Sequence, residues 1–145
     1  MGSENLPLVS ILIPSYKPRH FEIALTSALA QTYQNKEVIV SDDCPTDAIA
    51  RICERYPDVH YSKNLQKGPN RNLLRLIGLA NGTYVKYLLD DDLLHPLCVS
   101  RMVDAFGLGE NIKLVFSARD HIDEDNRIIS QARHLSAKSG VMKIE

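Results

Sequence analysis

Three observations predict an α/β fold with a mostly parallel central sheet flanked by helices. Short apolar segments rich in Val, Ile and Leu alternate with segments whose apolar residues recur at helical spacing. Several of the short segments are almost continuously apolar, as in strands that are buried on both faces of a parallel sheet. The length, 145 residues, suits one domain with a substantial core. We therefore expect a single α/β sandwich.

The first half of the chain supplies three strands and two helices. Its expected strands are apolar runs that stop at Pro, Asp or polar residues, and its expected helices carry apolar residues three and four positions apart. Thr46 has the residue type and the position of a helix N-cap. In chain order we expect a strand at 8–13 that ends at Pro14, a helix at 21–31, a strand at 37–41, a helix from Thr46 toward Tyr56 and a strand at 59–61.

The second half continues the alternation. Asn81-Gly82 follows an apolar helical pattern and indicates a helix stop, and Asp125-Asn126 indicates a hairpin turn. In chain order we expect a helix ending near Ala80, a strand at 84–89 that is buried on both faces, a helix around 99–106, a strand at 112–117 and a hairpin over 122–129. Residues 1–7 are expected to form a disordered leader, and 131–145 a tail to which we assign no structure.

Composition excludes several classes. A net charge of −1 without a basic run argues against nucleic acid as a partner, and no apolar run is long enough to span a bilayer. The three cysteines are widely spaced and never form a C-x-x-C pair, so we expect free thiols rather than a zinc site. Without a signal sequence the chain is expected in the cytoplasm, at the inner face of the membrane if it is part of a longer protein.

Polar residues gather where three of the expected strands end. In open parallel sheets, ligands bind at the carboxyl ends of the strands. Pro14-Ser15-Tyr16 offers backbone amides, a hydroxyl and an aromatic ring for a flat base, and Asp42-Asp43 offers acceptors for a base N–H or a ribose hydroxyl. Asp90-Asp91-Asp92 could hold a divalent cation against a diphosphate. Basic side chains available for phosphate are those of Lys67, Arg71 and Lys86.

Other interpretations remain open at this point. The acidic triplet alone could be a solvated loop with one carboxylate capping the helix that starts near Pro96. A receiver-type or phosphoryl-transfer α/β module also uses paired acids and magnesium, although it would place the acids after the first strand. A catalytically silent module that binds a nucleotide sugar is a further alternative, because a fold alone does not fix chemistry.

An ordered set of motifs runs through most of the chain. It consists of Val9-Ser10-Ile11-Leu12-Ile13-Pro14-Ser15-Tyr16, Ser27 through Gln31-Thr32-Tyr33, Glu37-Val38-Ile39-Val40-Ser41-Asp42-Asp43, then Asn64, Gly68, Arg71-Asn72, Ala80-Asn81-Gly82-Thr83-Tyr84, Asp90-Asp91-Asp92 and Pro96. This set resembles the inverting family 2 glycosyltransferases, and the likeness runs from about Val9 to about Asp123. The resemblance implies the N-terminal, donor-binding region of a GT-A fold. It also implies a nucleoside-diphosphate sugar donor, usually a UDP-sugar, a divalent metal (Mn²⁺ or Mg²⁺) and a role in cell-surface polysaccharide biosynthesis.

The resemblance also assigns roles by position. Pro14, Ser15 and Tyr16 would line the uracil and ribose site. Asp43 would meet the uracil edge with Asp42 behind it, Arg71 would lie near the nucleotide, and Asp90 would fill a variable slot beside the nucleotide. Asp91 and Asp92 would bind the metal, with Asp91 the principal ligand. The chain departs from the family pattern at Leu89, where an acid is common, at Cys44-Pro45 and at Asn70.

The implied reaction is a single displacement that inverts the anomeric carbon of the sugar. A carboxylate base would deprotonate the acceptor hydroxyl, and the resemblance places that base beyond Glu145. We therefore expect the C-terminal part of the fold to be truncated and this fragment alone to transfer sugar poorly. The acceptor, whether a glycan, a lipid-linked molecule or a protein, is not indicated. Exposed apolar surface at a sheet edge would favour a homo-oligomer.

Overall fold

The structure is a computed structural model that describes residues 6–132. The chain divides into two compact units, Met1–Ser100 and Arg101–Glu145. Most of the expected leader at 1–7 and of the expected tail at 131–145 lies outside the described residues. Leu6 and Pro7 are described, and their carbonyl oxygens accept hydrogen bonds from Asn35 and Tyr33. Within residues 6–132, no helix has the length and apolar character needed to cross a membrane.

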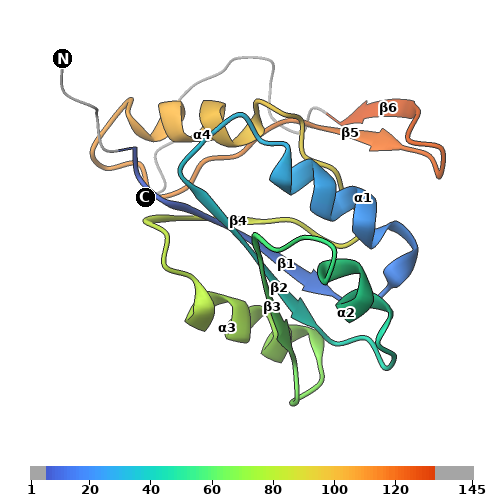
Figure 1. Ribbon diagram of the computed structural model, residues 1–145. Coiled ribbons are helices and arrows are strands. Elements are labelled where there is room, and N and C mark those ends of the chain that lie inside the picture. Colours follow the sequence, from blue (N-terminus) through green and yellow to red (C-terminus); the bar gives the residue numbers. More distant parts are fainter. Residues whose placement is uncertain (1–5, 133–145) are drawn as a thin grey trace. The chain divides into compact units, whose positions relative to one another are not determined.

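The first unit is built on a four-stranded sheet with the order β3-β2-β1-β4, in which every neighbouring pair is parallel (Figure 1). This arrangement confirms the predicted α/β fold with a mostly parallel sheet. Its elements are β1 (Val9–Ser15), α1 (Pro18–Leu29), β2 (Lys36–Asp42), α2 (Ala48–Cys53), β3 (Val59–Lys63), α3 (Pro69–Leu79) and β4 (Tyr84–Tyr87).

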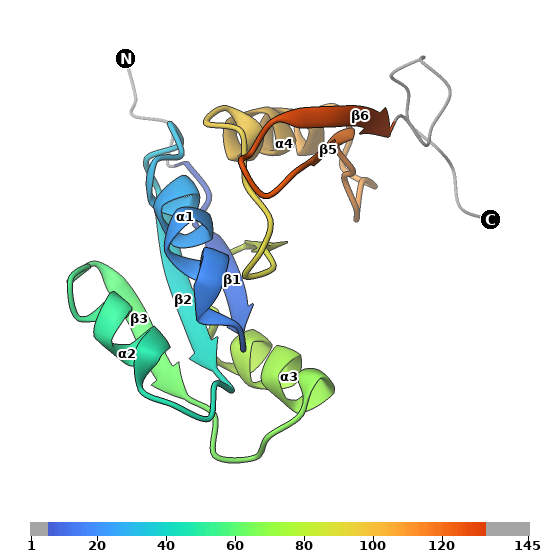
Figure 2. The ribbon, with the colours of Figure 1, turned by 90° about the vertical axis from the view of Figure 1, so that its right-hand side faces the viewer.

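Helices cover both faces of this sheet. α1 and α2 lie on one face and α3 lies on the other, as two views at right angles show (Figures 1 and 2). The spacing predicts an apolar face on α1, and the helix buries four of its residues, Phe21, Ala24, Leu25 and Ala28, whereas Leu29, the fifth, is half-buried. On the opposite face, Leu12 of β1 and Ile39 of β2 pack against Leu76 of α3. Burying each such Leu or Ile contributes about 1.5–3 kcal/mol, so the apolar patterns fix which face each helix covers.

The sequence predicts that the first strand ends at Pro14. In the structure, β1 instead continues through Pro14 to Ser15. The Leu88 amide donates to the Leu12 carbonyl on the β4 side of β1, whereas the Asp43 amide donates to the Ser15 carbonyl on the β2 side. Because backbone groups alternate along a strand, Pro14 faces the β4 side beyond the last β1–β4 hydrogen bond. Its missing N–H therefore breaks no ladder bond, and the strand can continue.

Helix starts differ by a few residues from those expected. α1 begins at Pro18, in the first helical position, where its missing N–H costs nothing. Asp47 rather than Thr46 is the N-cap of α2. The hydroxyl of Thr46 still accepts a long hydrogen bond, 3.4 Å, from the amide of Ala48. These shifts leave the order of the elements unchanged.

β4 is not buried on both faces, which corrects the prediction made for 84–89. Val85, Tyr87 and Leu89 are exposed by 46%, 36% and 50%. Val85 and Tyr87 are register partners of Ser10 and Leu12, so they share the face on which α3 packs. α3 contacts β1 and β2 instead, and among residues 6–132 β4 pairs only with β1. β4 is therefore an edge strand with an exposed apolar face.

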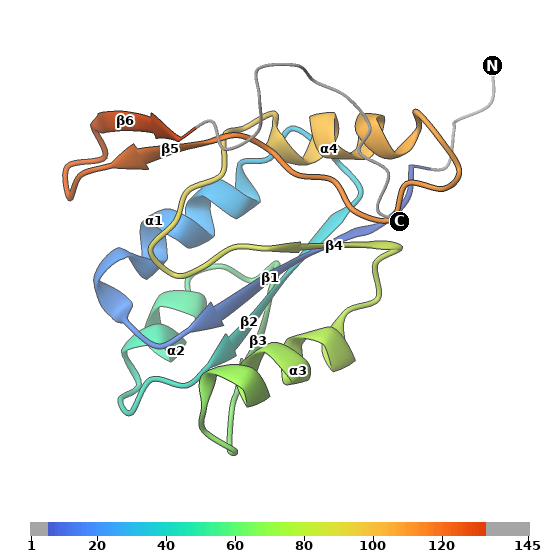
Figure 3. The same cartoon turned by 180° about the vertical axis from the view of Figure 1, so that it is seen from behind.

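The second unit contains the predicted hairpin but not the predicted strand at 112–117. α4 (Cys98–Phe106) begins at the end of the first unit and continues into the second, and β5 (Arg119–Ile122) pairs antiparallel with β6 (Ile128–Ala132), as Figure 3 shows. Asn126 adopts a φ of 62°, and the Asp123 carboxylate accepts from two backbone amides in the turn. The apolar segment 112–117 has no ladder partner among the described residues, and a strand requires one.

A network of hydrogen bonds joins β1, β2 and the segment before β4 near the amino ends of these strands. The hydroxyl of Ser10 and the backbone amide of Asn81 both donate to the carboxylate of Glu37, and the amide of Gly82 donates to the Ser10 hydroxyl. Burial alone would raise the pKa of Glu37, but the hydrogen bonds from Ser10 and Asn81 outweigh it and lower that pKa. The network therefore stabilises the fold above the usual glutamate pKa and loses this contribution as the pH falls through the lowered value.

Candidate functional site

The carboxyl ends of the strands lie in line along one edge of the sheet. In the parallel register Ser15 pairs with Asp42, and Asp42 pairs with Lys63. The line continues past the strands, because the Asp43 amide donates to Ser15 and the Asn64 amide donates to Asp42, each over 2.8 Å. The predicted positions after β1 and β2 are thus brought together by backbone hydrogen bonds.

β1 and β4 separate at this edge. Their last hydrogen bond joins the Leu88 amide to the Leu12 carbonyl over 3.0 Å, three residues before Ser15. From the β1 end the chain passes through α1 to β2, on one side of β1, whereas β4 lies on its other side. This is the topological switch point of the sheet, the place where open α/β sheets bind their ligands. Pro14-Ser15-Tyr16 and Asp90 flank it.

Asp43 is oriented by two donors that arrive from the segment after β3. Asn64 Nδ2 donates to Oδ1 over 2.8 Å, and the backbone amide of Gly68 donates to Oδ2 over 2.9 Å. Only 6% of Asp43 is exposed. Neither Asn64 nor Gly68 was assigned to the site, although both belong to the ordered motif set. They fix the direction in which the remaining acceptor capacity of Asp43 points.

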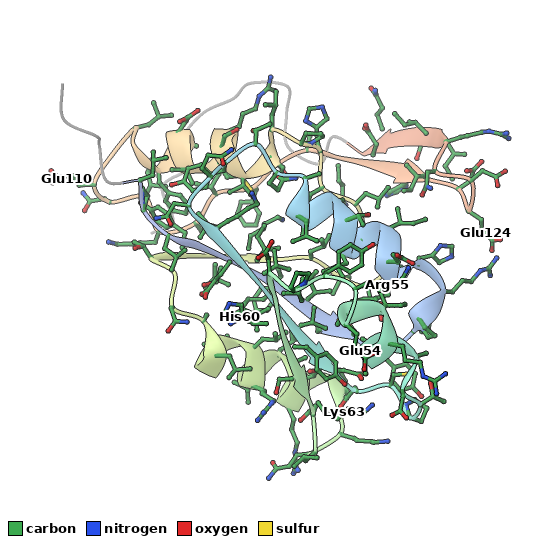
Figure 4. All side chains as sticks on the ribbon, viewed as in Figure 1. Glu54, Arg55, His60, Lys63, Glu110 and Glu124 are labelled. Atoms are coloured by element: carbon green, nitrogen blue, oxygen red, sulfur yellow. The ribbon has the colours of Figure 1, made fainter. Side chains whose placement is uncertain are left out.

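Asp42 lies behind Asp43 and is fully buried. Its Oδ1 accepts from the Cys44 amide, and its Oδ2 accepts from the Tyr61 hydroxyl over 2.7 Å and from Lys63 Nζ over 3.0 Å. Lys63, labelled in Figure 4 near the end of β3, supplies the counter-charge that a buried carboxylate requires. The sequence analysis did not single out Lys63, because an isolated Lys at a strand end gives no signal of its partner.

Desolvation raises the pKa values of two other groups that face this carboxylate. Burial, together with the hydrogen bond to Asp42, raises the pKa of Tyr61, so its hydroxyl remains a donor at neutral pH. Burial and the nearby Asp42 charge raise the pKa of the Cys53 thiol to about 12. Cys53 is a buried free thiol, and its raised pKa disfavours the reactive thiolate form.

Asp90 reaches across the separation between β4 and β1. Its Oδ2 accepts from the backbone amides of Tyr16 and Lys17, over 2.7 and 2.8 Å. Tyr16 is 58% exposed, whereas Ser15 is fully buried and its hydroxyl donates a long hydrogen bond, 3.4 Å, to the Ile13 carbonyl. At this strand end, Tyr16 is thus open to solvent and the Ser15 hydroxyl is not.

Asp91 and Asp92 follow as exposed residues. Within residues 6–132, no group of three His, Cys, Asp or Glu side chains could hold a metal by itself. Mg²⁺ and similar hard cations are commonly bound by one or two carboxylates, with water and substrate phosphate completing the shell. Two adjacent exposed carboxylates at the end of a strand fit a site of that kind.

The segment after the acidic triplet is fixed to the end of α1 by Gln31. Its side-chain Nε2 donates to the carbonyls of Ser27 and His95, and its Oε1 accepts from the Val99 amide over 3.0 Å. The side chain of Gln31 is buried. Further hydrogen bonds join Thr32 to the Pro96 carbonyl and the Leu94 amide to the Ser27 hydroxyl. The Ser27, Gln31 and Thr32 motif thus supports the loop that carries the exposed acids.

We expect Gln31→Ala to lower the free energy of unfolding by about 2 kcal/mol, because it leaves the buried Val99 amide and the His95 carbonyl without this partner. Urea unfolding of the 145-residue chain measures the change. Gln66→Ala is the matched control, since Gln66 is exposed and its side chain makes no hydrogen bond within residues 6–132. Equal effects of the two substitutions would contradict an anchoring role for Gln31.

The three basic side chains proposed for phosphate are placed differently. Arg71 is exposed in the first turn of α3, three residues after the Gly68 amide that binds Asp43, and Lys67 is exposed in the preceding loop. Both stand close in sequence to the site. Lys86 pairs with Ile11 within the β1–β4 ladder, four residues before Asp90, so the fold does not bring it to the strand ends.

Comparisons with known proteins agree with this geometry. A family model described as glycosyl transferase family 2 matches residues 10–143. Chondroitin synthase of Escherichia coli is 31% identical over 132 residues, which are 88% of this chain and 19% of that protein. This chain therefore spans about a fifth of that relative's length.

Two solved structures share the fold. TarS of S. aureus in complex with UDP-GlcNAc superimposes with a TM-score of 0.66 at 20% identity, over 79% of this chain and 40% of TarS. A mannosyltransferase from Pyrobaculum calidifontis, solved with GDP-Man and Mn²⁺, gives a TM-score of 0.55 at 26% identity, over 62% of this chain and 29% of that protein.

Proposed function

The chain belongs to glycosyl transferase family 2, and from this premise we propose that its first unit binds a nucleoside-diphosphate sugar, a UDP-sugar, as the donor for sugar transfer. The observation that carries the proposal is the convergence at the β1–β4 switch point. Tyr16, Asp43 and the acidic triplet come from three strand ends along one edge of the sheet. The aromatic ring of Tyr16 suits a flat base, and the Asp43 carboxylate suits a donor on the base or the ribose. The acidic triplet suits a cation that binds the diphosphate.

The base and ribose are assigned to the β1 and β2 ends. The exposed Tyr16 ring offers a face for the base, and Pro14 lies two residues before it, near the end of β1. Asp43, oriented by Asn64 and Gly68, accepts from an N–H at the base edge. Asp42 already accepts three hydrogen bonds, so we assign it to supporting Asp43 rather than to contacting the ligand. Arg71 is close enough in sequence to Gly68 to lie beside the nucleotide.

The diphosphate is assigned to the β4 end. Phosphate charges beside exposed carboxylates repel one another, which argues for a divalent cation held by Asp91 and Asp92. When bound, Mn²⁺ or Mg²⁺ would neutralise charge on the leaving diphosphate. The acids of this chain follow β2 and β4 rather than β1, which does not suit a receiver-type module.

The proposed reaction is a single displacement at the anomeric carbon, with inversion, by a hydroxyl of an acceptor. Chondroitin synthase among the relatives, and UDP-GlcNAc and GDP-Man in the solved neighbours, support a nucleotide-sugar donor and a role in building polysaccharide. The two neighbours carry different bases, so the base is the point to test first.

We expect UDP to bind on the order of a hundredfold more tightly with Mn²⁺ than with a chelator. A hundredfold gain in affinity corresponds to about 2.7 kcal/mol. It is smaller than the interaction energy of ~4 kcal/mol between two unit charges that lie 4 Å apart at an effective dielectric constant of 20. Calorimetric titration of UDP, GDP and ADP, each with Mn²⁺ and with EDTA, measures it.

The comparison of bases is the internal control. Preference for UDP over GDP and ADP supports the uridine assignment, and preference for GDP moves the proposal to a GDP-sugar. Equal UDP affinity with and without Mn²⁺ would overturn the metal role. No binding of any of the three nucleotides would overturn donor binding itself.

A further inference from the structure

We propose that Asp90 is a positioning residue that holds the turn between β1 and α1, and through it the Tyr16 ring, in the place where the base of the donor binds. The inference rests on the proposed function and deepens it, because it separates the three acids of the triplet by role. Asp90 acts through the backbone of the base-binding turn, whereas the proposed function assigns Asp91 and Asp92 to the cation.

The contact is specific in its geometry. One oxygen of Asp90, Oδ2, accepts from two consecutive backbone amides, those of Tyr16 and Lys17, over 2.7 and 2.8 Å. Both distances are typical of charge-assisted hydrogen bonds. The acceptor and the donors are more than 70 residues apart in the chain. The contact therefore joins two strand ends that have already separated at Leu12 and Leu88.

The turn has a local need for this acceptor. Lys17 is the N-cap residue of α1 and makes no side-chain cap, and the first turn of α1 contains no acidic residue. Pro18 follows and carries no N–H, so the Tyr16 and Lys17 amides are the last donors before it. A negative charge next to the start of a helix is favoured by the helix dipole. Asp90 supplies both the acceptor and the charge from another strand.

The consequence for the site follows from exposure. Tyr16 is 58% exposed and its side chain makes no hydrogen bond within residues 6–132, so packing does little to fix the position of the ring. Its backbone is held on one side by Ser15, which pairs with β2, and on the other by the Asp90 carboxylate. Loss of Asp90 should therefore displace the ring from the base even when no phosphate or metal is present.

The experiment compares Asp90→Asn, Asp90→Glu and Asp90→Ala with the wild-type chain. Asn keeps an acceptor oxygen at the same distance, Glu keeps the charge but moves the acceptor by one methylene, and Ala removes both. Asp58→Ala is the matched control, because Asp58 is an exposed acid whose side chain makes no hydrogen bond within residues 6–132. Binding of uridine without metal and of UDP with Mn²⁺ is measured by calorimetry, and amide hydrogen exchange is followed at Tyr16 and Lys17.

We expect Asp90→Ala and Asp90→Glu to weaken uridine binding about tenfold and to speed exchange at both amides, the scale of one lost charge-assisted hydrogen bond. Asp90→Asn should stay within about threefold of the wild-type chain and keep the gain from Mn²⁺. Should the Ala variant not fold, the Glu variant carries the same test.

Two results would overturn the inference while leaving the proposed function intact. If Asp90→Asn abolished the gain from Mn²⁺, Asp90 would be a metal ligand. If Asp90→Glu and Asp90→Ala lowered only the thermal stability and left uridine affinity unchanged, its role would be structural alone. If the wild-type chain bound neither uridine nor UDP, the proposed function would fail, and this inference would fail with it.

Discussion

Asp91→Asn is expected to return the UDP affinity measured with Mn²⁺ to the value measured with EDTA, a loss on the order of a hundredfold. The substitution keeps the size of the side chain but removes the charge that a hard cation requires. Even residues that only support metal ligands change metal affinity by about 10–100-fold when replaced. Calorimetric titration of UDP at fixed Mn²⁺ measures the effect, and uridine, which has no phosphate, should bind the variant as it binds the wild-type chain.

Asp43→Asn is the contrasting variant. Both carboxylate oxygens of Asp43 face donors, from Asn64 and from Gly68, so an amide must turn its own NH₂ group toward one of them. We expect this variant to bind uridine about tenfold more weakly while keeping most of the gain from Mn²⁺. If Asp43→Asn and Asp91→Asn weakened uridine equally, the separation of a base side from a metal side would be wrong.

The order of the elements could be predicted from the sequence because helices and strands have different apolar patterns. Apolar residues recur three and four positions apart in the helices and form short, nearly continuous runs in the strands. The errors occur where a ladder partner or a neighbouring layer decides the outcome. Pro14 stays in β1 because β4 has already separated from that side of the strand, and the segment 112–117 is apolar like a strand but lacks a partner in the described part of the chain. An apolar pattern alone does not show whether a segment has a partner strand.

The positions of the candidate site could be predicted because a parallel sheet brings its carboxyl strand ends to one edge. The way in which the acids are held could not be predicted. Asp42, Asp43 and Asp90 look equivalent in sequence, yet one is paired with Lys63, one is held by Asn64 and Gly68, and one accepts from two amides of the β1 turn. These partners lie 21 to 74 residues away, so only the fold reveals them.

Gly82→Ala is expected to lower the free energy of unfolding by about 3 kcal/mol or more, a large part of the 5–15 kcal/mol typical of a domain. A Cβ at Gly82 would lie 2.6 Å from the Ser10 amide nitrogen, 2.6 Å from the Ser10 hydroxyl and 2.7 Å from the Tyr84 carbonyl. Two of these atoms are backbone atoms held by the pairing of β1 with β4, so they cannot move without weakening it. Urea unfolding of the chain measures the change.

Gly78→Ala makes the same chemical change four residues earlier and should have the opposite sign. Gly78 lies in α3 and is exposed, and a Cβ there would meet nothing within 4 Å. Alanine in a helix is favoured over glycine by about 0.5–1 kcal/mol, so this variant should be more stable than the wild-type chain. If both variants were more stable than the wild-type chain, the reduced freedom of the unfolded chain, rather than the contact with Ser10 and Tyr84, would decide the effect at Gly82. Because the Gly82 amide also donates to Ser10, the Ala variant should in addition loosen the network around Glu37.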